Sequence, residues 1–126
     1  MCINMSAFRL IALIAVMISV SGCGSQDDPV LCTEEYRTIA VEILGGELDN
    51  WRTIRLSTQD TFKLVTTFQN KYPILDDAFV RTLNQAEEQF QFQGILDDSV
   101  RVDEVYSISA DACHIQYVSG SLRVSL

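Results

Sequence analysis

The 126-residue chain has few of the residues on which enzyme and nucleic-acid sites depend. It has one histidine, and it contains 9 basic and 17 acidic side chains, which gives a net charge of −8. This acidic excess argues against nucleic acid as a partner, because like charges repel. The 6 glycines form no phosphate-binding loop, and no recognisable nucleophile turn accompanies His114. These deficits argue against nucleotide-dependent chemistry and give little support to catalysis of any kind.

The chain also lacks an apolar run long enough to span a bilayer. Residues 10–20 (LIALIAVMISV) form an uncharged run of 11 residues. As a helix this run would measure about 16 Å, against a hydrocarbon core of about 30 Å. It follows a cationic start that contains Arg9, and this layout is typical of a secretory signal peptide. The sequence therefore predicts a signal peptide over residues 1–22, with translation starting at either Met1 or Met5.

The end of this run, Val20-Ser21-Gly22-Cys23, resembles the lipobox of bacterial lipoproteins. The resemblance implies that Cys23 becomes the first residue of the mature chain and that its thiol carries a diacylglycerol. Such a lipid attaches a protein to the membrane without a transmembrane helix. Gly24 is not the aspartate that retains lipoproteins at the inner membrane, so the resemblance favours the outer membrane of the cell envelope. The alternative is an ordinary signal peptide, or an uncleaved anchor, that happens to contain a cysteine.

The four cysteines divide by position. Cys2 lies in the predicted signal peptide and Cys23 is the predicted lipidation site, which leaves Cys32 and Cys113. Export delivers this pair to an oxidising compartment, where two otherwise unassigned cysteines predict a disulfide. The alternative is two separate buried thiols, each acting as a small apolar side chain.

Removal of residues 1–22 leaves 104 residues, with 8 basic and 17 acidic side chains. Residues 23–31 are polar and acidic and contain Pro29, which predicts a lipidated tether. Residues 32–126 are then enough for one domain with a modest core.

Alternating apolar and polar residues predict that this domain is mainly β. One strand is expected from Thr33 to the glycines at 45–46, with Ile39, Val41 and Ile43 on one face, and residues 51–56 are expected as its hairpin partner or a near neighbour. Residues 59–68 fit either a strand or a helix. Residues 76–86 predict a short helix, because acids precede an apolar helical face. Further strands are expected within residues 90–94, 100–106, 113–117 and 122–126. The predicted fold class is an antiparallel β-sandwich, or an open barrel, of about seven strands with one short helix.

Two segments of the domain carry a further resemblance. The sequence ISADACHIQYVSG at residues 108–120, with CTEEYRT at residues 32–38, resembles small exported bacterial lipoproteins. It is also similar to prealbumin-like and carboxypeptidase-regulatory-like sandwiches. The resemblance implies a β-sandwich on a lipid tether and brings no catalytic residue with it.

Several polar clusters are candidates for chemistry. Asp111, Cys113 and His114 are metal-ligand types, but in a strand the last two point to opposite faces and a disulfide removes the thiolate. We therefore expect no metal there, but a turn aspartate beside a half-exposed histidine. The acid pairs at 76–77 and 97–98 lack the glycine-centred pattern of a calcium loop, so we expect a helix cap and a hairpin turn.

Trp51 lies near a turn, where an exposed aromatic can contact a ligand or partner, although a core position is the alternative. The function that the sequence favours is a lipid-anchored binding or scaffolding domain of the cell envelope, without a cofactor and with an envelope protein as candidate partner. The alternative is an envelope hydrolase that uses carboxylates near His114.

Overall fold

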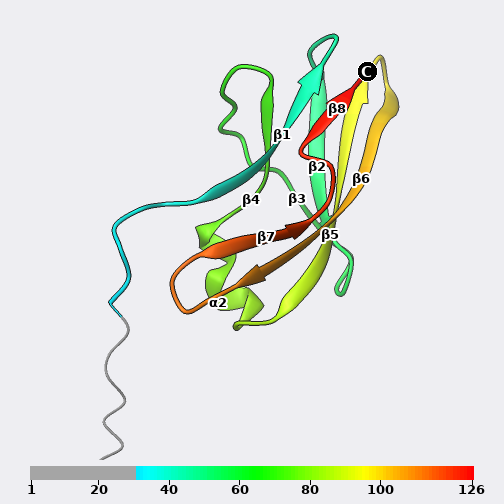
Figure 1. Cartoon of the computed structure of the whole chain (residues 1–126). Coiled ribbons are helices and arrows are strands. Elements are labelled where there is room, and N and C mark those ends of the chain that lie inside the picture. The colour runs from blue at the N-terminus through cyan, green and yellow to red at the C-terminus, as the bar shows by residue number, and fades with distance from the viewer. Residues whose placement is uncertain (1–30) are drawn as a thin grey trace, which may run out of the picture.

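The computed structural model describes residues 31–126, so the predicted signal peptide, Cys23 and most of the tether lie outside the described residues. These residues form a β-sandwich of two packed sheets, and the predicted fold class is confirmed (Figure 1). One sheet has three strands in the order β4-β1-β8, and the other has five in the order β3-β2-β5-β6-β7. The eight strands are β1 (Thr38–Leu44), β2 (Asn50–Arg55), β3 (Asp60–Phe62), β4 (Lys71–Asp76), β5 (Glu87–Leu96), β6 (Ser99–Ala110), β7 (Ile115–Ser119) and β8 (Arg123–Ser125).

The core lies between the two sheets and is supplied by alternate residues of each strand. On β1, Val41 and Ile43 are fully buried, as the alternation predicts. Phe90 and Phe92 on β5 face them from the larger sheet and are also fully buried. Each such side chain contributes about 1.5–3 kcal/mol on burial. The rest of the buried apolar core is Leu48, Tyr72, Ile74, Leu75, Leu83, Val102, Tyr106, Ile108, Ala110 and Ile115.

The longest hairpin joins β5 to β6 through a two-residue turn. Asp97 and Asp98 both have positive φ angles, of 51° and 60°. Positive φ at both central residues is the requirement of a type I′ turn, which matches the twist of the flanking strands. The expected hairpin turn at this acid pair is confirmed.

The last two strands belong to different sheets, so the chain crosses from one to the other between them. Gly120 makes this crossing with a φ of +124°, and a Cβ there would lie only 2.4 Å from the Tyr106 ring. The Tyr106 hydroxyl donates a hydrogen bond to the Ser121 carbonyl and holds the bend. Among the described strands, β8 is the only one paired in parallel, beside residues 42–44 of β1.

The predicted helix is present but shorter than residues 76–86. It comprises a 3-10 turn, η1 (Asp77–Phe79), followed by α2 (Val80–Leu83). The Asp76 side chain accepts a hydrogen bond from the Ala78 N–H, which confirms the expected cap. Asn84 and Gln85 have positive φ angles, so the helix ends there. Within residues 31–126, no helix is long and apolar enough to cross a membrane.

Three sequence expectations for the first half of the domain need correction. β1 begins at Thr38 and not at Thr33. β1 and β2 do not form a hairpin but lie in opposite sheets, because the connection carries Leu48 into the core, where its N–H bonds the Tyr72 hydroxyl. The sequence also misses β4, whose apolar run contains Pro73 and a bulge and therefore does not alternate. Of the ambiguous residues 59–68, only Asp60–Phe62 form a strand.

Candidate functional site

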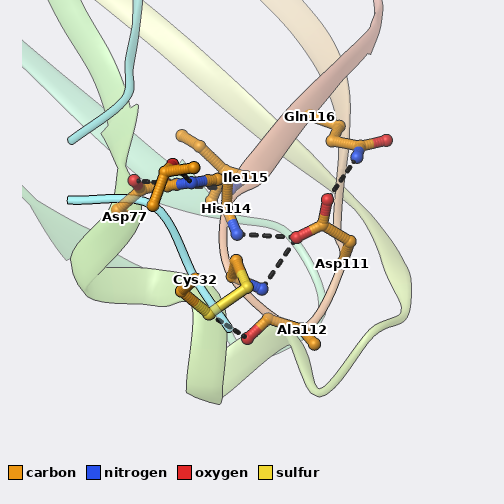
Figure 2. The surroundings of a disulfide bond; sticks show 9 residues. Cys32, Asp77, Asp111, Ala112, His114, Ile115 and Gln116 are labelled. Carbon is orange, nitrogen blue, oxygen red and sulfur yellow. Dashed lines mark hydrogen bonds and ion pairs between the residues drawn. A yellow bond between two sulfur atoms is a disulfide. The ribbon is translucent and has the colours of Figure 1, made fainter. Parts of the chain in front are cut away.

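A disulfide joins Cys32 to Cys113, as predicted, with their Cα atoms 5.2 Å apart (Figure 2). It connects the start of the described chain to the bend between β6 and β7. These cysteines are 81 positions apart in the sequence. The bond therefore fixes the point where the N-terminal segment meets the sandwich, at the end that also carries α2 (Figure 1).

The bend that holds Cys113 is organised by Asp111. One oxygen of its carboxylate accepts hydrogen bonds from the backbone N–H groups of Cys113 and His114, both at 2.7 Å. Its other oxygen accepts from the Gln116 side chain at 2.7 Å. The two backbone hydrogen bonds, from His114 and then Cys113, are the main cause of the lowered pKa of Asp111. Cys113 and His114 thus lie in a bend before β7 and not in a strand, contrary to the sequence expectation.

His114 is buried, with 6% of its surface exposed, which corrects the expectation of a half-exposed side chain. Its Nδ1 lies 2.8 Å from Asp77 Oδ2. On the other side of the ring, Nε2 lies 2.9 Å from the hydroxyl oxygen of Thr33. A carboxylate, an imidazole and an exposed hydroxyl thus form one hydrogen-bonded row beside the disulfide.

Asp77 lies at one end of this row, and its carboxylate joins its own segment to two others. Besides the imidazole, its carboxylate accepts hydrogen bonds from the backbone N–H groups of Arg37 at 2.8 Å and Ile115 at 2.9 Å. Burial alone would raise the pKa of Asp77, but these hydrogen bonds outweigh it and the pKa is lowered. Because Asp77 is an anion at neutral pH, the imidazole proton must sit on Nδ1. In the neutral ring, Nε2 therefore accepts the hydrogen bond and the Thr33 hydroxyl donates it.

The sequence had no signal for two members of this row. Thr33 and Asp77 lie 81 and 37 positions from His114, so no local spacing connects them. Asp77 was expected only as part of a helix cap, although Asp76 is the residue that caps. Across residues 31–126, no group of three or more histidine, cysteine or carboxylate side chains is placed to hold a metal ion.

Trp51, the predicted contact residue, lies at the margin of the core and is half-buried. Its indole N–H donates to the Leu64 carbonyl at 2.8 Å, and its ring meets Tyr72 edge-on with centroids 5.0 Å apart. The Lys63 ammonium lies 4.1 Å above the ring centre. These contacts position Trp51 firmly, and its role toward a ligand stays a prediction.

A groove runs along the side of the sandwich between β1 and β7. It consists of two adjoining depressions, of about 480 and 500 Å³, both lined by Thr38, Ile39 and Tyr117. Tyr117 is 44% exposed. Neither depression is lined by His114, but the second is lined by Arg37 and Ile115, whose N–H groups bond Asp77, so the groove adjoins the Asp77 row without including its imidazole. The other lining residues are Ala40, Glu42, Lys71, Leu122 and Arg123 in the first depression and Glu35, Tyr36, Arg37, Ile115 and Gln116 in the second.

Comparison of the chain with known protein families, with curated proteins and with solved structures finds no match in any of the three.

Proposed function

We propose that this protein is an exported lipoprotein, attached to the cell envelope by a lipid on Cys23, whose β-sandwich acts by binding another envelope component. The observation that carries this proposal is the Cys32–Cys113 disulfide. Disulfides persist in oxidising compartments outside the cytosol, and the signal-like residues 1–22 supply a route there. The lipobox resemblance at Cys23 and the glycine that follows it favour the outer membrane.

The geometry of the domain suits a lipid tether. Residues 23–31 reach at most about 30 Å when fully extended. The disulfide fixes the next residue at the end of the sandwich that carries α2 and the β6–β7 bend (Figure 1). That end therefore faces the membrane, and the β5–β6 turn at the opposite end faces away. We expect the sandwich to bind its partner without a cofactor.

Metabolic labelling tests the anchor. Cells producing the full chain are grown with an alkyne analogue of palmitate, and the protein is purified and conjugated to a fluorophore. We expect label on the wild type and none on Cys23→Ser. Cys32→Ser is the matched control, since it also replaces a cysteine by serine but should keep the label. An unlabelled wild-type protein would overturn the proposal of a lipid anchor.

A second candidate function, an envelope hydrolase, is favoured by one observation. The Thr33 hydroxyl, the His114 imidazole and the Asp77 carboxylate have the connectivity of a nucleophile, a general base and an orienting acid. In such a reaction the Thr33 oxygen would attack an ester carbonyl while its proton passes to His114 Nε2. The leaving alkoxide would then take that proton, and water would hydrolyse the acyl-threonine. Thr33 is exposed, so substrate would approach it directly from solvent.

A fluorophosphonate probe separates the two candidates. A hydrolase predicts covalent labelling of the wild type that survives Thr33→Ser and disappears in both Thr33→Val and His114→Gln. A binding domain predicts no labelling of any form. In that case the row acts only as a structural link, and Thr33→Val should lower stability without changing any reactivity.

A further inference from the structure

We propose that the groove between β1 and β7 accepts an extended, acidic peptide segment of another envelope protein, which adds a strand beside the first half of β1. This inference rests on the proposed binding function and names the surface and the kind of partner. It depends on the unpaired strand edges that border the groove and on the charges at one end of it.

The first half of β1 has one edge without a strand partner. The Glu42 N–H donates to the Leu122 carbonyl on the β8 side at 2.8 Å, whereas the Ile43 N–H donates to the Asn70 carbonyl on the β4 side at 2.8 Å. Alternate residues of a strand direct their backbone groups to the same side, so Thr38 and Ala40 face the β8 side with Glu42. Within the described chain, β8 pairs with β1 only over residues 42–44. The N–H and C=O groups of Thr38 and Ala40 are therefore free of strand pairing.

The facing edge of β7 also has no strand partner within the described chain, although one of its N–H groups is bonded to a side chain. The Ile115 N–H bonds the Asp77 carboxylate and so points away from β6. Tyr117 lies two residues further along, before the bulge at Val118, and its backbone groups point to the same side. Natural proteins protect exposed edges with charged residues or proline, but β7 (IQYVS) has neither. An open, unprotected edge that borders a depression is the geometry used for β-strand addition.

Charge complementarity identifies the occupant as acidic. In a chain of net charge −8, one end of the groove contains Lys71 of β4 and Arg123 of β8, which lie on either side of Glu42 of β1. Arg123 pairs with Glu42 at 3.1 Å, whereas Lys71 forms no ion pair with any residue between 31 and 126. The rest of this acidic surface would repel an acidic segment, so Lys71 orients it toward this end of the groove.

Peptide binding to the full chain, purified from envelopes with its lipid, tests the proposal. The probe is a fluorescein-labelled heptapeptide with valine at alternate positions and aspartate or glutamate between them, followed by fluorescence anisotropy. Two comparison peptides carry proline at the centre or lysine in place of the acids. We expect saturable binding of the acidic peptide and none of either comparison peptide.

Two variants locate the site. Lys71→Glu should weaken binding by up to about fivefold, the upper end of the range for one exposed ion pair. Arg101→Glu makes the same charge change on an exposed residue of β6 outside the groove and should leave affinity unchanged. Ala40→Pro should abolish binding, because it removes a donor that faces the groove and breaks no existing strand hydrogen bond. Hydrogen exchange at Thr38 and Ala40 should slow in the peptide complex, which a change in overall stability alone would not produce.

Equal affinity for the acidic and lysine peptides, or equal weakening by Lys71→Glu and Arg101→Glu, would overturn the proposal. So would a dimer in sedimentation analysis that Ala40→Pro dissociates, because a second copy would then be the occupant. Tighter peptide binding after removal of residues 24–30 would instead identify the chain's own tether as the occupant. If palmitate labelling succeeds while all peptides fail, the strand site is wrong and the lipid anchor stands.

Discussion

Removal of the disulfide is the most informative perturbation of this fold. The double variant Cys32→Ser/Cys113→Ser opens a covalent loop that contains nearly all of the described domain. On the chain-entropy relation, a loop of this size, about 82 residues, corresponds to about 4.5 kcal/mol at 25 °C. Small domains are stable by only about 5–15 kcal/mol, so the variant should be marginal. The core should be unchanged, because both cysteines lie outside the buried apolar cluster.

Urea denaturation of the purified protein, followed by tryptophan fluorescence, measures this loss. The wild type under reducing conditions should match the double variant, whereas the oxidised wild type should unfold at a much higher urea concentration. A drop of about 4 kcal/mol corresponds to a fall in Tm of about 15–30 °C for a domain of this length. A loss below about 1 kcal/mol would refute the reasoning, since the remaining contacts of Thr33 and Arg37 would then hold the N-terminal segment without the covalent bond.

Three further predictions concern single residues. Gly120→Ala should lower the free energy of unfolding by more than about 2 kcal/mol, because the backbone there has a positive φ and the new Cβ has no room. Gly46→Ala should lower it less, because the added Cβ would meet only one atom of a flexible side chain. Thr53→Val should cost about 1–3 kcal/mol by leaving the buried Ile74 carbonyl without its hydrogen bond from the threonine hydroxyl, and a stability equal to that of the wild type would contradict this. The lowered pKa of Asp77 means that its stabilising effect is full above about pH 4, the ordinary range of an aspartate, and is lost as the pH falls through its folded-state pKa. Asp77→Asn should therefore flatten the acid limb of the stability curve, and an unchanged limb in urea titrations between neutral and acidic pH would refute this.

Alternation was sufficient to predict most of the sandwich from the sequence. Val41 and Ile43 on β1, and Phe90 and Phe92 on β5, obey the two-residue period because only one face of each strand is buried. The failure at β4 has a physical cause: Tyr72, Pro73, Ile74 and Leu75 are all buried, so the period disappears. The sequence also did not show which strands pair. β1 and β2 lie in different sheets because Leu48, in the connection between them, is buried in the core.

Only two parts of the candidate site could be predicted from the sequence: the disulfide, and the turn formed by residues close together in the chain. The disulfide followed from elimination among four cysteines, and the Asp111 turn followed from local sequence. The burial of His114 and its link to Asp77 and Thr33 did not, because they arise when three distant segments meet at one end of the sandwich. The groove was also invisible in the sequence, since it depends on where β8 stops pairing with β1.

The disulfide also determines how mechanical tension would travel through the molecule. A pull on the N-terminus reaches Cys32 and passes through the sulfur atoms into the bend between β6 and β7. The force thus bypasses β1, which would otherwise be peeled from β4 one hydrogen bond at a time. Only after reduction would the force reach β1, the central strand of the smaller sheet, so an oxidised molecule pulled by its N-terminus should resist unfolding far longer than a reduced one.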